Sequence, residues 1–329
     1  MNPQGARILI TGGCGFIGSA TAQLLLQEHR PAKVILLDDL SRGRLDNVSH
    51  LMPDPRLSFV HGDIRNSTLL DTVTAGCDAV IHLAALRITA CASDPRTAME
   101  VMCQGSFNVL DAARRAHVKR VVVASSASVY GHADQFPTPE IHHPWNNDTW
   151  YGSCKVLLEG LLRSFHQMYG QPGIALRYFN VYGERMDTFG KYTEVLVRWM
   201  ERIAQELPPV IQGDGKQTLD FIHVRDVARA NVAALQSEHV YGAFNVGSGV
   251  ETSLNDLARL VLKTMGSRLE PRYEPARGVS AVNRRCADTQ RSADLLQFQS
   301  RVGLEQGIGH LVTWWKQQAA QPQAAQSLT

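Results

Sequence analysis

Two residues near the middle of the chain, Tyr151 and Lys155, have the types and the spacing that suit acid–base chemistry. They belong to the stretch YGSCK, and residues four apart lie on one face of a helix. An ammonium group beside a phenol favours the phenolate, so we expect Lys155 to lower the pKa of Tyr151 from its usual value of about 10. A tyrosine perturbed in this way serves as a general base and acid. Taken alone, the stretch is equally consistent with an exposed tyrosine–lysine pair that has no function.

A glycine-rich stretch, TGGCGFIG at 11–18, follows the first strand-like run. It matches GxGxxG through Gly13, Gly15 and Gly18, or GxxGxxG through Gly12, Gly15 and Gly18. Such glycines let the backbone turn tightly and approach a pyrophosphate, and the following helix offers free N–H groups. Asp38 ends the second strand-like run, where a carboxylate accepts ribose hydroxyls and repels a 2′-phosphate. These features predict a dinucleotide site that favours NAD over NADP.

The elements that must position these residues alternate between strand and helix. Near-continuous apolar runs of strand length are typical of a parallel sheet that is buried on both faces. The runs lie at 7–11, 33–38, 57–62, 79–84, 120–125 and 173–179, with helix-like stretches at 16–29, 96–117 and 150–169. We therefore predict an α/β fold built on a Rossmann-type, doubly wound parallel sheet.

The pattern changes after Asn180, where the loops become longer. Two further strand-like runs lie at 221–224 and 243–247, and two helix patterns at 252–265 and 304–316. We predict a Rossmann domain at 1–180 that binds NAD, a smaller C-terminal α/β region at 181–317 that binds substrate, and a flexible tail at 318–329 that has little to bury.

Charge and cysteine usage argue against several classes of protein. The net charge is +2 and no long run of one sign occurs, so we expect no nucleic-acid partner. No apolar stretch approaches the roughly 18 residues of a membrane span, and the first residues do not resemble a signal sequence. We therefore expect a cytoplasmic protein without a membrane partner. The six cysteines are dispersed without zinc-binding spacing, so we expect reduced thiols and no metal site.

Five motifs occur in the order seen in extended short-chain dehydrogenases and cover nearly the whole chain. They are TGGCGFIG at 11–18, SSASVYG at 125–131, YGSCK at 151–155, RYFNVYG at 177–183 and GDGKQTLDFIHVRDVA at 213–228. The sequence thus resembles the branch of NAD-dependent nucleotide-sugar epimerases and dehydratases typified by UDP-glucose 4-epimerase. This resemblance implies a UDP-linked sugar substrate and a homodimer formed by the helices at 96–117 and 150–169.

The resemblance also implies roles for individual residues. It assigns catalysis to Ser126, Tyr151 and Lys155, with Ser126 holding the reacting hydroxyl and Lys155 the nicotinamide ribose. It assigns cofactor contacts to Gly12, Gly15, Phe16, Ile17, Gly18, Asp38, Asp63, Ile64, Leu83, Ala84, Ala85, Tyr151, Lys155 and Phe179. It assigns substrate contacts to Arg87, Ser126, Asn180 and Arg285, of which Asn180 reaches the diphosphate.

The residues after Ser126 favour one reaction of this family. Family dehydratases carry an Asp–Glu pair at the positions of Ala127 and Ser128, and decarboxylases keep the Glu; neither residue of this chain can transfer a proton in that way. We predict a 4-epimerase, in which Tyr151 takes the C4 hydroxyl proton while NAD⁺ accepts the C4 hydride and returns it to the other face of the 4-keto sugar. Two alternatives stay open: a dehydrogenase or reductase that releases NADH, and a non-catalytic NAD-binding protein.

Several positions depart from the epimerase pattern. Leu219 and Gly278 stand where two arginines clamp the diphosphate, and the remaining candidates for that charge are Arg87, Arg277, Arg284 and Arg285. Arg285 also falls near the position that gates sugar size, so it binds the diphosphate, reads the carboxylate of a uronic acid, or is simply solvated. Met102 replaces an asparagine near the nicotinamide. We read His82 and His223 as packing residues.

Overall fold

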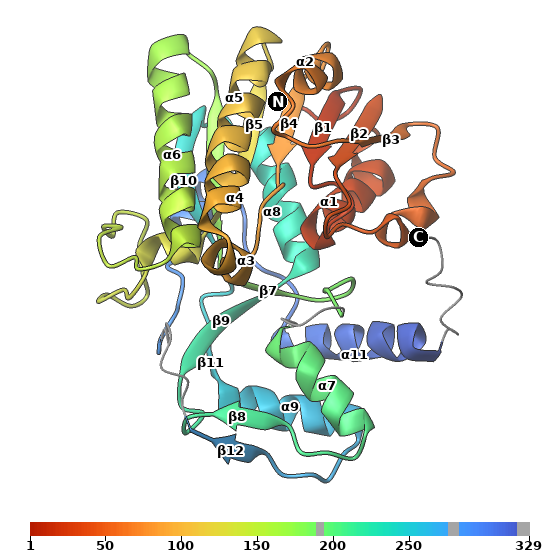
Figure 1. The fold of residues 1–329 in the computed structure, drawn as a ribbon, viewed down its shortest axis with the longest axis vertical. Helices are drawn as coiled ribbons and strands as arrows, with labels where there is room; N and C mark the ends of the chain where they lie inside the picture. Colours follow the sequence, from red (N-terminus) through yellow and green to blue (C-terminus); the bar gives the residue numbers. More distant parts are fainter. Residues whose placement is uncertain (189–193, 276–282, 321–329) are drawn as a thin grey trace.

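A seven-stranded parallel sheet forms the centre of the larger part of the molecule (Figure 1). The computed structural model describes residues 1–188, 194–275 and 283–320. The strand order is β10-β6-β5-β4-β1-β2-β3, so the predicted doubly wound, Rossmann-type sheet is confirmed. Its strands are β1 (Arg7–Thr11), β2 (Lys33–Asp38), β3 (Leu57–His61), β4 (Ala79–His82), β5 (Arg120–Ser126), β6 (Gly173–Tyr178) and β10 (Tyr241–Val246).

Helices cover both faces of this sheet, because successive strand residues point to opposite sides. Ile8 and Ile10 of β1 pack in one apolar cluster with α1 and α8, whereas Leu9 packs on the other face with α2, α5 and α6. The helices of this part are α1 (Phe16–Leu24), η1 (Leu25–His29), η2 (Leu45–Asn47), η3 (Ser49–Leu51), α2 (Ser67–Thr74), α3 (Ile88–Ser93), α4 (Pro95–Ala98), η4 (Met99–Gly105), α5 (Ser106–Arg115), η5 (Ala127–Tyr130), α6 (Trp150–Tyr169), α8 (Val224–Gln236) and α10 (Gln290–Leu296).

A smaller part with its own apolar core lies below the large sheet in Figure 1. Trp199, Leu257 and Ile308 belong to this core and come from three different helices. None of the helices in the described ranges is long and apolar enough to span a membrane. The elements of this part are β7 (Asn180–Tyr182), α7 (Val195–Ala204), β8 (Val210–Gln212), β9 (Thr218–His223), β11 (Glu251–Ser253), α9 (Leu254–Met265), β12 (Arg272–Glu274) and α11 (Leu304–Ala320).

The chain returns to the large sheet after the boundary predicted at residue 180. Strand β10 pairs with β6, and α8 packs against α1, so the run at 243–247 belongs to the large sheet and not to the smaller part. Composition cannot reveal this return, because a buried strand has the same apolar residues in either sheet. Helix α11 extends to Ala320, so the first three residues of the predicted tail at 318–329 are helical, and the rest lie outside the described residues.

The carboxyl ends of the parallel strands meet at the edge that faces the smaller part. Gly12 follows β1, Asp38 ends β2, Asp63 follows β3, Leu83 follows β4 and Ser126 ends β5. Ligands of open α/β sheets bind outside this edge, where the strand order reverses. The topology therefore gathers residues that are far apart in the sequence.

Candidate active site

A cavity of about 930 Å³ lies at this edge, between the large sheet and the smaller part. Most of the residues assigned by resemblance line it: Gly12, Gly15, Phe16, Ile17, Gly18, Asp38, Asp63, Ile64, Leu83, Ala84, Ala85, Arg87, Tyr151, Lys155 and Arg285. Ser126, Phe179 and Asn180 are not among its lining residues. A cavity of this size at the switch point of the sheet suits a dinucleotide.

The glycine turn has no room for side chains. A Cβ on Gly18 would lie 2.2 Å from the Gly12 oxygen, and a Cβ on Gly13 would lie 2.7 Å from the Leu36 Cβ. Gly12 also has φ +68°, which L residues rarely adopt, and a Cβ there would lie 2.8 Å from the Ala84 nitrogen. Glycine is thus required at Gly12, Gly13 and Gly18, which together belong to both motif matches. Without side chains here, the start of α1 stays open to a pyrophosphate.

Asp38 is held in place at the end of β2 by backbone N–H groups. Its Oδ2 accepts a hydrogen bond from the Cys14 N–H at 2.9 Å, and its Oδ1 accepts one from the Leu40 N–H at 2.9 Å. Burial raises the pKa of Asp38, and these two hydrogen bonds act in the opposite direction. Each carboxylate oxygen has a second lone pair, so the residue fits the ribose hydroxyls that were predicted to bind it.

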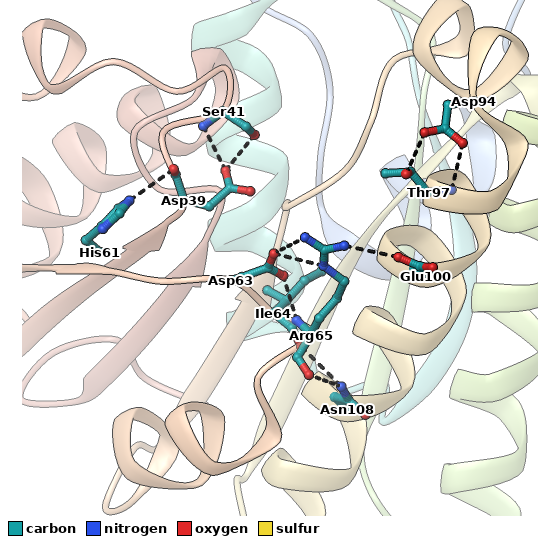
Figure 2. A network of polar contacts seen from close by, with 10 residues as sticks. All are labelled: Asp39, Ser41, His61, Asp63, Ile64, Arg65, Asp94, Thr97, Glu100 and Asn108. Carbon is teal, nitrogen blue, oxygen red and sulfur yellow. Dashed lines mark hydrogen bonds and ion pairs between the residues drawn. The ribbon is translucent and has the colours of Figure 1, made fainter. Parts of the chain in front are cut away.

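The loop after β3 is fixed by an arginine between two carboxylates (Figure 2). Arg65 Nη2 lies 2.6 Å from Asp63 Oδ2, and Arg65 Nη1 lies 3.1 Å from Glu100 Oε2. Asn108 Nδ2 donates to the Arg65 oxygen at 3.1 Å and to the Ile64 oxygen at 3.3 Å. The network ties Asp63 and Ile64 to η4 and α5. Their place beside adenine stays a prediction, and these contacts define the position of the loop that carries them.

The three predicted catalytic residues meet where β5 ends and α6 begins. Thr149 Oγ1 accepts the Gly152 N–H at 3.1 Å and caps α6, which places Tyr151 in its first turn. The Tyr151 hydroxyl lies close enough to Ser126 for the serine to lower the pKa of the tyrosine. The Lys155 Nζ is buried, donates to the Ala124 oxygen at 2.6 Å, and lies 5.6 Å from the centroid of the Tyr151 ring.

The electrostatics of this group differ from the expectation. Burial raises the pKa of Tyr151, while the hydrogen bond from Ser126 and the charges of Arg285 and Arg42 lower it by less. Burial also lowers the pKa of Lys155 from 10.5 to about 8. The expected decrease in the pKa of Tyr151 is therefore wrong for the ligand-free protein. Helical spacing shows which charges are near, but it does not show how much water is lost.

Two predicted site residues, Phe179 and Asn180, do not line the cavity and have partners within the protein. Phe179 is buried in an apolar cluster with Tyr130 and Ala287. Asn180 donates from Nδ2 to the Asp220 oxygen at 2.9 Å. Their roles at the nicotinamide and at the diphosphate stay predictions.

The positions that depart from the epimerase pattern have structural explanations. Leu219 packs against the apolar core of the smaller part, and the sulfur of Met102 accepts the Leu86 N–H at 3.1 Å. His82 lies between Thr11 Oγ1 at 2.7 Å and Ser106 Oγ at 3.0 Å, and burial lowers its pKa to about 3, so it is a packing residue as expected. Gly278 and Arg277 lie outside the described residues.

Among the described residues, two groups of ionisable side chains have distances that a cation would fit, but none of their members lines the cavity. In the first, Glu184, His223 and His310, the His223 Nδ1 accepts the Arg225 N–H at 3.3 Å, so Nε2 carries the proton and faces Glu184 Oε2 at 3.3 Å. The second consists of Asp134, His142 and His143, with His142 Nε2 2.8 Å from an oxygen of Asp134. The absence of a metal site stays a prediction.

Sequence reasoning missed a set of residues that close the cavity from the smaller part. Asp187 Oδ2 lies 3.2 Å from Arg42 Nε and 3.6 Å from Arg87 Nη2, so ion pairs cross between the two parts. Trp314 and Trp315 of α11 also line the cavity. No local pattern marks these residues, because they become neighbours of the glycine turn only through the fold.

Comparison with known proteins agrees with these features. Residues 8–247 match the model of the NAD dependent epimerase/dehydratase family. The UDP-glucose 4-epimerase of Mycolicibacterium smegmatis is 34% identical over 313 residues, which cover 94% of this chain and 98% of that protein. The dTDP-glucose 4,6-dehydratase of an Actinoplanes species is 30% identical over 327 residues, which cover 94% of this chain and 98% of that protein.

A solved structure matches almost the entire chain. It is the UDP-N-acetylglucosamine 4-epimerase from Methanobrevibacter ruminantium in complex with UDP-N-acetylmuramic acid, with a TM-score of 0.90 and 29% identity over 96% of this chain and 99% of that one. Together with the glycine turn and the Ser126, Tyr151 and Lys155 group, these matches confirm the resemblance seen in the motifs. The chain belongs to the NAD dependent epimerase/dehydratase family.

Proposed function

We propose that the protein is an NAD-dependent 4-epimerase of a UDP-linked sugar. The observation that carries this proposal is the group of Ser126, Tyr151 and Lys155, of which the tyrosine and the lysine line the cavity. In addition, Ala127 and Ser128 follow Ser126 in place of a carboxylate pair. The similarity to proteins named as 4-epimerases supports it.

Each residue of the site has a separate task in this reaction. The glycine turn and Asp38 bind the cofactor, which when bound supplies a reversible hydride acceptor. Tyr151 takes the proton of the C4 hydroxyl and later returns it, while Ser126 holds the reacting hydroxyl. Because burial raises the pKa of Tyr151, positive charge must favour the phenolate, and Arg285 and Arg42 supply it.

Elimination of water is disfavoured at this site, although the family includes dehydratases. Dehydration needs an acid for the leaving hydroxyl and a base for the C5 proton. Ala127 and Ser128 are buried in η5 and offer neither. The described carboxylates that line the cavity come from β2 and η2, from the segments after β2, β3 and β7, and from α7, not from η5.

The test is turnover of a panel of nucleotide sugars by the purified protein with NAD⁺. We expect interconversion of the C4 epimers of at least one UDP-sugar, resolved by chromatography and NMR, without net NADH formation, and we expect Tyr151→Phe to abolish it. Net NADH formation would support the dehydrogenase alternative. No conversion of any sugar, with unchanged NAD binding, would support the non-catalytic alternative.

We also propose that the protein is a cytoplasmic homodimer. Three apolar side chains on η4, α5 and α6 are exposed: Met99 at 45%, Phe107 at 41% and Leu157 at 42%. Their helices are those expected to form a four-helix bundle with a second copy. Light scattering should give twice the mass of the chain, and Phe107→Glu should reduce it to that of the monomer.

A further inference from the structure

A buried arginine, Arg285, lines the cavity together with the catalytic tyrosine and has no counter-charge in contact with it. Its Nε is buried without a hydrogen-bond partner. Within the ranges that the structure describes, no carboxylate lies within 4.0 Å of its guanidinium. Two other arginines of the cavity, Arg42 and Arg87, both face Asp187. Arg285 is thus a cationic group whose pairing the protein leaves incomplete.

The backbone fixes where this arginine lies. The Arg285 N–H donates to the Thr218 oxygen of β9 at 2.9 Å, and two residues later the Ala287 N–H donates to Asp220 Oδ2 at 3.1 Å. The preceding Arg284 does not line the cavity and so is no longer a candidate for the diphosphate contact. Its Nη2 lies 2.6 Å from Glu251 Oε1, and its side chain is half exposed. The cavity therefore receives one arginine of this adjacent pair in a defined position.

Burial of an unpaired guanidinium is unfavourable in the ligand-free protein. Loss of water lowers the pKa of Arg285, while Tyr151 and Asp148 attract its charge from a distance. Asp148 Oδ2 already lies 3.3 Å from His132 Nε2. An anionic group delivered by a ligand would complete the pairing, because an arginine binds a carboxylate or phosphate through two parallel N–H···O bonds.

The chemistry of the sugar decides which anion is within reach. Tyr151 must contact the hydroxyl on C4, and C6 is attached to the neighbouring carbon of the ring. The diphosphate is attached to C1, on the opposite side of the ring from C4. A cation at the tyrosine end of the cavity therefore meets a substituent on C6 before it meets the diphosphate. We propose that Arg285 binds the C6 carboxylate of the substrate, so that the substrate is a nucleotide-linked uronic acid; this inference rests on the proposed 4-epimerase function.

The test compares an acidic and a neutral substrate with matched variants. We would measure kcat/KM for UDP-glucuronate and UDP-glucose, and their Kd by calorimetry on the NAD-loaded protein, for wild type, Arg285→Gln and Arg284→Gln. We expect wild type to prefer UDP-glucuronate. We expect Arg285→Gln to reduce kcat/KM for UDP-glucuronate by about 10- to 100-fold more than for UDP-glucose, the usual range for a hydrogen-bonded charge pair. Arg284→Gln should change neither substrate by more than about 3-fold.

The competing roles of this residue give different results. Equal losses for both sugars in Arg285→Gln would overturn the inference, because they would indicate a diphosphate contact or a general effect on Tyr151. Conversion of UDP-glucose without preference for UDP-glucuronate in wild type would overturn it while leaving the epimerase function intact. If wild type converts no sugar, the proposed epimerase function is wrong. The role of Arg285 is then judged from binding alone, and equal wild-type Kd values for UDP-glucuronate and UDP-glucose would overturn it. If Arg285→Gln does not fold, Arg285→Lys replaces it and should lose part of the preference.

Discussion

The buried ammonium of Lys155 predicts that an inactive variant will be more stable than the wild type. Burial lowers the pKa of Lys155 from 10.5 to about 8, which corresponds to a cost of about 3 kcal/mol for keeping the charge in the folded, cofactor-free protein. A methionine has a similar length and fills the same space without a charge. Replacement of Lys155 by methionine leaves the Ala124 oxygen without the hydrogen bond it now accepts at 2.6 Å, a loss of about 1–2 kcal/mol. Lys155→Met should therefore increase the free energy of unfolding by about 1–2 kcal/mol at pH 7.

The pH dependence of this difference has a defined sign. Below pH 8, both the folded and the unfolded wild type hold the lysine proton, so the full cost of burial is present. Between pH 8 and 10.5, the folded state releases this proton first and the unfolded state binds more protons, so the stability of the wild type increases with pH. The advantage of Lys155→Met should consequently disappear across this window.

The assay is thermal and urea unfolding of protein stripped of NAD, because a bound cofactor would add its own stabilisation. Lys216→Met is the matched control, since the Lys216 side chain is 81% exposed. We expect Lys155→Met to raise the melting temperature by a few degrees at pH 7 and Lys216→Met to leave it unchanged. A melting temperature of Lys155→Met below that of wild type at pH 7 would refute the reasoning.

Three further substitutions test single parts of the site and its scaffold. Tyr151→Phe should reduce kcat by at least about 100-fold while the NAD affinity from fluorescence titration stays within about 2-fold. Gly18→Ala should abolish NAD binding, because its Cβ would lie 2.2 Å from the Gly12 oxygen, whereas Gly160→Ala, whose Cβ meets open space, should bind NAD normally. Asn66→Ala removes the N-cap of α2 and should lower the free energy of unfolding by about 1 kcal/mol in urea without a change in kcat.

The glycine turn and the Tyr151–Lys155 pair could be predicted because they depend on local geometry. Strand β2 is a short apolar run that ends at Asp38, so its length alone places the carboxylate at the edge of the sheet. Thr149 caps the start of α6, and Tyr151 and Lys155 are four residues apart, so both lie on the helix face toward the end of β5. Such features need only the rise of a strand and the period of a helix.

Features that depend on distant pairing could not be predicted in this way. The place of β10 beside β6 joins Tyr241 to Gly173, and nothing in the run at 243–247 identifies that neighbour. The ion pairs of Asp187 and the position of Trp314 require the smaller part to be packed against the large sheet. The pKa of Tyr151 is raised and not lowered as expected from the sequence, because the loss of water around this residue is a property of the complete fold.

Burial raises the pKa of Tyr151 and nearby positive charge lowers it, so a substrate that changes this charge also changes the strength of the base. Arg285 lowers the pKa of Tyr151, together with Ser126 and Arg42, and a carboxylate bound to Arg285 would cancel that part of the effect. Tyr151 would then have a higher pKa in the complex with an acidic sugar than in the complex with a neutral one. The acidic limb of the kcat profile, which reports loss of the phenolate, should therefore lie at higher pH for UDP-glucuronate than for UDP-glucose. In Arg285→Gln both limbs should move to higher pH, because the arginine that favours the phenolate is gone from both complexes. A limb at lower pH for UDP-glucuronate would show that its carboxylate does not lie beside Arg285.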